Sequence, residues 1–148
     1  MGNEIFLVQD IVYYDVIKTE GGNKYKYLNI VDLPIDNADM EALKEQLVDI
    51  HKVVVKAGHT MNLEGMSILN LHSYPGVQLN TIVEQLAPKY ISFWGANPQK
   101  IGLNILPMKG MVWNGIKILR LDNVDQTLND ANLKSKTEEY LKFLFGIK

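Results

Sequence analysis

Short runs of apolar residues alternate along this chain with longer segments in which apolar residues recur every three or four positions. The clearest short run, Tyr90–Trp94, lies between Pro88 and Pro98 and is followed by Gly95. A run of this length, rich in aromatic residues and bounded by breakers, is typical of a buried strand. The same reasoning predicts four core strands: Tyr25–Leu33, Ser67–Leu71, Tyr90–Trp94 and Ile116–Leu121.

The periodic segments predict three helices. The first spans Ala38–Ala57, where an apolar stripe continues at helical spacing until Gly58 ends it. A second, shorter helix covers Leu79–Leu86, and the last covers Leu128–Phe145. The stretch Pro98–Trp113 is expected to be a loop, because glycine and proline interrupt it repeatedly.

Strands that alternate with helices predict an α/β fold of three layers, with a mainly parallel central sheet between two layers of helices. The chain has 148 residues and shows neither a linker nor an internal repeat, so residues 1–148 are expected to form a single domain. Ligands of such sheets bind at the carboxyl ends of the strands. Gly95 follows one of these ends, and its backbone freedom allows a sharp turn there.

The first segment, Glu4–Lys18, does not follow one clean helical or strand period. We expect a short helix or arm to about Gln9, followed by a strand within Ile11–Ile17. Two interpretations stay open for residues 1–18. They form an arm that docks a partner, with Phe6 and Tyr13 as contacts, or they pack as an ordinary edge element with one buried face.

Composition narrows the classes of function. Hydrophobic residues make up 47% of the chain and charged residues 22%, as in a soluble domain, and no apolar run approaches the roughly 20 residues of a membrane span. No basic segment opens the chain as in a secretory signal, and cysteine is absent, so a cytoplasmic location is expected. A net charge of -2 argues against strong direct binding of nucleic acid. The sequence contains no phosphate loop, and no cofactor is expected.

Four blocks occur in a common order between Ser67 and Leu144: Ile68–Leu71, Leu86–Gly95, Asn114–Ile116 and Asp130–Lys134. Together they resemble the uracil-DNA-glycosylase fold superfamily over about half of the chain. The first block looks like that family's strand with a uracil-binding asparagine, here Asn70. The second is similar to its block of leucine, proline, lysine, apolar strand and glycine. The third resembles the stretch that leads to its His-Pro-Ser motif, and the fourth the start of its last helix.

The chain departs from this family where the family's chemistry lies. After the first core strand, Val31–Ile35 lacks the paired glycines of the motif that positions the attacking water. The histidine that stabilises the departing uracil falls at Asp122 and Asn123, and a carboxylate there would repel the developing negative charge. The cysteines of the iron–sulfur subfamilies are also missing. A working glycosylase is therefore not expected.

One branch of the superfamily shares the fold without the chemistry. The segments Phe6–Lys18 and Leu128–Leu144 look similar to the N-terminal arm and the last helix of the psi-subunit family of bacterial DNA polymerase III. Members of that family connect the clamp loader to the chi subunit, which contacts single-strand binding protein. The resemblance implies a role in DNA replication through protein partners such as clamp-loader subunits.

Five residues near the predicted carboxyl edge of the sheet are candidates for binding a ligand: Asn70, His72, Gly95, Asn97 and Asp122. His72 is expected either to pack beneath the turn at Tyr74 or to serve a site. His51 is expected to be a solvated residue of the long helix. The histidines lack paired metal-ligand spacing, so no metal site is predicted.

Four residues are candidates for binding a protein partner: Phe6, Tyr13, Trp113 and Phe143. Trp113 is expected to be exposed in a loop, and an exposed tryptophan tends to mark a partner surface. The tail from Tyr140 to Lys148 has apolar residues on more than one helix face. It is either buried on both sides or presents Phe143 to a partner.

Three classes of function remain. The favoured hypothesis is a non-catalytic protein-binding module of the glycosylase fold, psi-like in character. The alternative is a divergent DNA glycosylase or nucleotide-handling enzyme of that fold, with a deep polar pocket beside Gly95 and Asn97. The third is an unrelated α/β domain that binds a small molecule.

Overall fold

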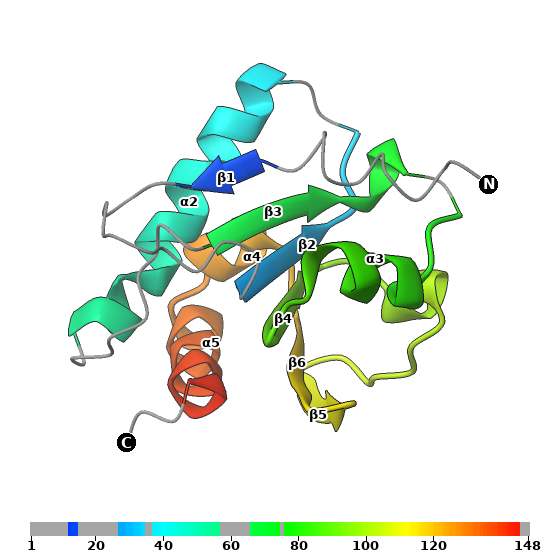
Figure 1. Ribbon diagram of the computed structural model, residues 1–148. Coiled ribbons are helices and arrows are strands. Elements are labelled where there is room, and N and C mark those ends of the chain that lie inside the picture. Colours follow the sequence, from blue (N-terminus) through cyan, green and yellow to red (C-terminus); the bar gives the residue numbers. More distant parts are fainter. Residues whose placement is uncertain (1–11, 15–26, 35–36, 57–65, 75, 146–148) are drawn as a thin grey trace.

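The computed structural model describes residues 12–14, 27–34, 37–56, 66–74 and 76–145. They form a six-stranded sheet with helices on both faces (Figure 1). The strands are β1 (Val12–Tyr14), β2 (Tyr27–Val31), β3 (Met66–Asn70), β4 (Tyr90–Trp94), β5 (Lys109–Trp113) and β6 (Ile116–Leu121). The helices are α2 (Asn37–Lys56), α3 (Leu79–Leu86), α4 (Val124–Asn129) and α5 (Ala131–Leu144), with short 3-10 helices η3 (Leu71–Ser73) and η4 (Pro98–Ile101).

The strand order is β1-β3-β2-β4-β6-β5. The four central strands are parallel, since β2 pairs with β3 and β4, and β4 pairs with β6. The two outermost strands are antiparallel to their neighbours. The predicted α/β class with a mainly parallel sheet is thus confirmed. The predicted bounds of β4, β6 and α3 agree with the structure, and α2 starts and ends one residue earlier than predicted.

Side chains alternate between the two faces of the central strands, as the pleat of a strand requires. Leu28 and Ile30 of β2 pack with Phe93 of β4 in the core beneath α3. Tyr27 and Trp94 face the other way and pack in a second core with residues of α2 and α5. Because both faces are covered, the middle strands read as continuous apolar runs, and this is why the sequence identified them.

The segment before β6 is not all loop, and this part of the prediction is wrong. Lys109–Trp113 forms β5, which pairs antiparallel with β6. The two strands are joined by Asn114 and Gly115, with φ angles of 50° and 80°. Positive φ at both central residues is the requirement of the tight hairpin turn that suits the twist of a strand pair, and asparagine followed by glycine satisfies it.

The last predicted helix is two helices. α4 ends at Asn129, and Asp130 has φ -127° and ψ 110°, which is extended backbone. The Asp130 carboxylate accepts hydrogen bonds from the backbone N–H groups of Asn132 and Leu133 at 3.0 and 3.1 Å. Asp130 therefore caps a new helix, α5, instead of continuing α4.

The N-terminal prediction can be followed only at β1. β1 pairs antiparallel with β3 at the edge of the sheet farthest from β5, which agrees with an edge element at this point (Figure 1). The remainder of Glu4–Lys18, including Phe6, lies outside the described residues. Gly58, predicted to end α2, also lies outside them.

Candidate functional site

His51 is buried in the core, so the expectation of a solvated residue is wrong. Its Nδ1 lies 2.6 Å from the carbonyl oxygen of Leu47, and its Nε2 lies 2.6 Å from the Tyr27 hydroxyl oxygen. A carbonyl only accepts, so Nδ1 carries the proton and Nε2 accepts one from Tyr27. The hydroxyl of Ser92 then donates to the Tyr27 oxygen at 2.9 Å. These contacts form a directed chain, Ser92 to Tyr27 to His51 to Leu47.

Because Tyr27 and His51 are buried, both side chains resist ionisation. Desolvation lowers the pKa of His51 to about 4, against a smaller opposing effect of the hydrogen bond to Leu47. Desolvation also raises the pKa of Tyr27 far above its usual range, and the hydrogen bond from Ser92 opposes this only in part. Both groups are neutral at physiological pH. All three side chains, Ser92, Tyr27 and His51, are buried in the interior of the fold.

Gly95 follows β4, and its backbone lies close to the chain at the end of β6. Its φ is +71°, and its N–H donates to the carbonyl of Leu121 at 2.9 Å. A Cβ built on Gly95 would lie 2.7 Å from the Cβ of Asn123 and 3.0 Å from its Cα. Neither the angle nor the space suits a side chain. Gly95 is thus a packing glycine at the carboxyl end of β4.

Asn70 ends β3, and its side chain is engaged by the backbone. The Oδ1 atom accepts from the N–H groups of Leu33 and His72 at 3.0 and 3.2 Å. The Nδ2 atom donates to the carbonyl oxygen of Leu33 at 2.8 Å. The amide therefore ties the chain after β2 to the chain after β3, and both of its polar atoms are used within the fold.

The candidate Asn97, and Asn123 next to the candidate Asp122, occupy helix starts at this edge. Asn97 caps η4, since its Oδ1 accepts from the N–H of Gln99 at 3.0 Å. Asn123, beside the candidate Asp122, caps α4 by accepting from the N–H of Gln126 at 2.7 Å. Side chains that cap a helix satisfy its first N–H groups. They are less available to a ligand than their position along the sequence suggests.

A pocket of about 420 Å³ does open at the carboxyl ends of β2 and β3. Its lining includes Asp32, His72, Tyr74 and Lys100, and Lys100 forms an ion pair with Asp32. His72 is exposed here and is not packed beneath the turn at Tyr74. It is the one ligand candidate of the five that lines this pocket; the other four lie outside its lining.

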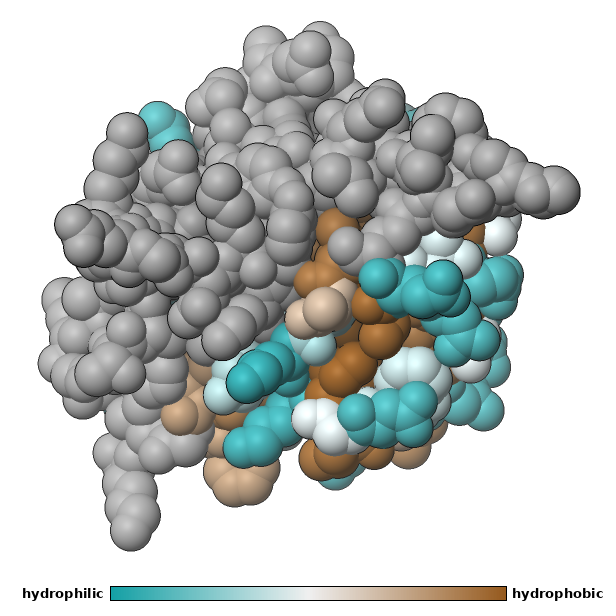
Figure 2. Space-filling view, viewed as in Figure 1, coloured by the Kyte–Doolittle hydropathy of each residue, from teal (hydrophilic) through white to brown (hydrophobic). Residues whose placement is uncertain are grey.

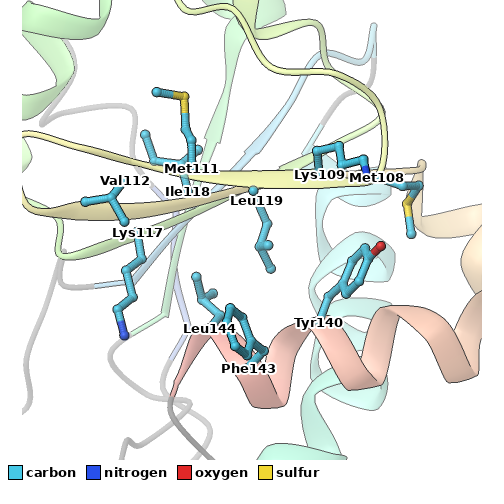
Figure 3. A pocket seen from close by; sticks show the side chains of 11 residues that line it. Met108, Lys109, Met111, Val112, Lys117, Ile118, Leu119, Tyr140, Phe143 and Leu144 are labelled. Atoms are coloured by element: carbon cyan, nitrogen blue, oxygen red, sulfur yellow. The ribbon is translucent and has the colours of Figure 1, made fainter.

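A larger hollow lies between the β5–β6 hairpin and α5. This α5–β5 groove has a volume of about 730 Å³, and its walls are mainly apolar. Leu119 points from β6 towards α5, while Tyr140, Phe143 and Leu144 point from α5 towards the strands (Figure 3). Gly110 lies on β5 opposite Leu119, where a side chain would come within 2.9 Å of the Leu119 methyl group. The small residue keeps the groove open at the sheet.

Two of the groove's apolar side chains are conspicuously exposed. Phe143 has 81% of its surface exposed, and Val112 has 65%. Figure 2 shows hydrophobic residues among hydrophilic ones across the surface that runs from α3 to β5. Single exposed apolar residues are ordinary, but these two line one groove.

The partner candidates meet different outcomes. Phe143 is exposed, as one of the two interpretations of the tail required. Trp113 is the last residue of β5 and is half-buried against the core beneath α3, so the expectation of an exposed loop residue is wrong. Tyr13 lies in β1 opposite Ser67, and Phe6 is outside the described residues.

β5, the strand that forms one wall of the groove, was not predicted from the sequence. Apolar residues at Met111, Val112 and Trp113, followed by Asn114 and Gly115 and a second strand, make a hairpin signal that was present in the chain. The glycine and proline residues before it masked this signal. Lys109, which lies in β5 and lines the groove, was not singled out for the same reason.

No protein-family model and no curated protein matches this chain. Among the described residues, none of the helices is both long and apolar enough to cross a membrane. The same residues contain no group of three or more histidine, cysteine, aspartate or glutamate side chains that could hold a metal ion. The 420 Å³ pocket and the α5–β5 groove, together with the resemblance of the sequence, are therefore the features that bear on function.

Proposed function

We propose that this chain is a non-catalytic protein-binding module, and that it contacts its partner at the α5–β5 groove. The observation that carries the proposal is the exposure of Phe143, 81% of whose surface faces solvent at the rim of an apolar groove. Covering an aromatic side chain of this kind contributes roughly 1.5–3 kcal/mol to association. Aromatic residues in such positions are the common anchors of protein interfaces.

The resemblance to the uracil-DNA-glycosylase fold gives this proposal a biological form. The carboxylate at Asp122 and the missing glycine pair after β2 argue against base excision. The polar groups at that edge also engage one another, as the amide of Asn70 does. A psi-like accessory subunit of a DNA polymerase III clamp loader, cytoplasmic and acting through protein contacts, fits a fold retained without its chemistry. The psi-like role is inferred by analogy between folds.

The test uses two exposed apolar residues, one in the groove and one outside it. Phe143 lies in the groove, whereas Leu106, 71% exposed, is not among the residues that line it. The tagged full chain, Phe143→Glu and Leu106→Glu are each used to recover partners from the native cell, with identification by mass spectrometry. The expected result is a partner retained by the parent and Leu106→Glu and lost by Phe143→Glu. A partner lost by both variants or by neither would contradict the assignment to this groove.

A second function is favoured by the pocket at the carboxyl ends of β2 and β3. Loops after β2 and β4 leave towards opposite faces of the sheet, and small ligands bind at such switch points. A divergent glycosylase or nucleotide-handling enzyme would use this pocket, with His72 and Lys100 at its mouth.

A direct assay separates the two functions. Because the leaving-group histidine is replaced by Asp122, the purified protein is expected to release no uracil from uracil-containing DNA. Release of free uracil above buffer, abolished in Asn70→Ala, would favour the enzyme and reject the binding module.

A further inference from the structure

β5 is the last strand of the sheet. It pairs with β6 on one side, and no described strand pairs with its other edge. The two-residue turn at Asn114 and Gly115 makes Trp113 and Ile116 the hydrogen-bonded pair next to it. The alternate residues, Gly110 and Val112, therefore direct their backbone N–H and C=O groups away from β6. An edge strand with free backbone groups is a template for another strand.

The side chains beside this edge are apolar on the face that looks to α5. Val112 and Lys117 are paired across the hairpin, so they share one face, as do Gly110 and Leu119. That face borders the α5–β5 groove (Figure 3). A strand added beyond β5 would place every second side chain over Val112 and towards Phe143. It would cover the two most exposed apolar residues of the groove.

The charge at the groove selects the added strand. Lys109 and Lys117 line the groove, and its lining contains no carboxylate. The whole chain has a net charge of -2, so this is a local basic site on an acidic protein. A second copy of β5 laid against the first would bring its own Lys109 to the same edge, where like charges repel. Lys109 lies on the face of Met111 and Trp113, opposite the groove face of Val112, so acidic side chains that alternate with apolar ones would complement Lys109.

We propose that the outer edge of β5 binds an extended partner segment in which apolar and acidic residues alternate, and that this segment becomes the seventh strand of the sheet. The backbone groups of Gly110 and Val112 hold the segment, as in strand addition to an exposed sheet edge. Its apolar side chains enter the α5–β5 groove over Val112, and its carboxylates lie on the other face of the sheet, beside Lys109. This inference rests on the proposed function, since it names the kind of partner that the groove takes.

The probe is a synthetic peptide in which glutamate alternates with isoleucine and phenylalanine. It is added to the full-length protein, and amide hydrogen exchange is followed residue by residue. The expected result is new protection at the amides of Gly110 and Val112, with little change at Met111, whose N–H already faces β6. A peptide with lysine in place of glutamate is expected to give no protection.

Two charge reversals complete the test. Lys109→Glu is expected to weaken the binding of the acidic peptide by about tenfold at low salt, because an attraction becomes a repulsion. Lys136→Glu is the control, because Lys136 is an exposed residue of α5 outside the groove lining. Equal loss in the two variants would mean a general charge effect and would overturn the proposal.

Other outcomes also reject it. Tighter binding by a peptide with glutamate and leucine at helical spacing, without protection of Val112, would mean a helix in the groove. Self-association of the protein through β5 would mean a second copy. In either case the proposed function stands if Phe143→Glu still loses the native partner. Strand addition by the acidic peptide with no effect of Phe143→Glu on that partner would reject the function and leave the strand site.

Discussion

The middle of the sheet and its β5 edge treat their side chains in opposite ways. In the middle strands, buried polar groups are paired with one another: Trp94 donates to Asn29 at 2.8 Å, and Tyr27 lies between His51 and Ser92. At the β5 edge, Val112 and Phe143 are exposed beside two lysines. The middle is closed by its own contacts, whereas the edge leaves apolar side chains exposed.

This difference separates stability from availability. An unpaired polar group in the interior costs about 1–3 kcal/mol, so the middle strands tolerate few changes. An exposed apolar residue contributes little buried surface, so changing it alters the stability of the fold little. The comparison predicts large losses of stability for changes in the middle and almost none at the edge, in the following order.

The largest effect is expected for Gly95→Val. Its φ of +71° strains a branched residue, and its Cβ would lie 2.7 Å from the Cβ of Asn123. Strain and overpacking together are expected to lower the free energy of unfolding by about 3–5 kcal/mol. The measurement is the urea midpoint of the variant against that of the parent.

Gly115→Ala separates the two causes. Gly115 has a φ of +80° and no heavy atom within 4 Å of the position of a Cβ. Only backbone strain applies, and the expected loss is about 1 kcal/mol. Equal losses at Gly95 and Gly115 would show that the approach of Gly95 to Asn123 is not tight.

Acid is expected to act through His51. Its pKa is lowered to about 4 in the folded protein and returns to roughly 6.5 on unfolding. The unfolded chain then binds the proton first, so stability is full above about pH 6.5 and falls as the pH drops towards 4. The loss across this window is about 3 kcal/mol, measured from urea midpoints at each pH.

Two variants assign this acid loss to one residue. His51→Gln removes the titrating group, and the difference in stability between neutral and acid pH is expected to shrink. His72→Ala removes an exposed histidine, and the difference is expected to remain. A parent protein equally stable at pH values above and below this window would contradict the buried neutral state of His51.

A smaller loss is expected for Asn70→Ala. The amide of Asn70 makes three hydrogen bonds to backbone groups, two of them to Leu33. Their removal leaves part-buried N–H and C=O groups unpaired, which is expected to cost about 2 kcal/mol. The control is Asn97→Ala, which removes a single bond from an exposed cap and is expected to cost less than about 1 kcal/mol. If thermal unfolding gave the two variants the same midpoint, the link between the segments after β2 and β3 would carry no special weight.

The sequence was informative where one physical pressure acted alone. β4 and β6 are short and largely buried apolar runs that follow a proline or a glycine turn, and their bounds were predicted without error. β5 was missed because an edge strand lacks that signal: Lys109 and Val112 are exposed, and Gly110 reads as a loop residue. The break between α4 and α5 was not predicted, because aspartate has a low helix propensity but still occurs inside helices.

The candidate site divides in the same way. The sharp turn predicted at Gly95 is confirmed by its φ of +71°. The place of His51 could not be predicted, because its partner Tyr27 is 24 residues away in the chain. Phe143 was identified as a candidate, but the groove that it lines was not predicted, because the other wall of the groove is the β5–β6 hairpin. Long-range pairing, rather than local propensity, decided each of these outcomes.

The smallest effect on stability is expected for Phe143→Glu. Phe143 is 81% exposed, so replacing it removes little buried surface, and the free energy of unfolding is expected to change by less than about 0.5 kcal/mol. Leu106→Glu, at 71% exposure, is expected to behave alike in the same urea titration. Under the proposed function, the two variants then differ only in partner binding, which Phe143→Glu weakens and Leu106→Glu leaves unchanged. A loss of more than about 1 kcal/mol in Phe143→Glu alone would mean that Phe143 supports the fold, and the contrast between a closed middle and an open edge would fail at the residue that carries it.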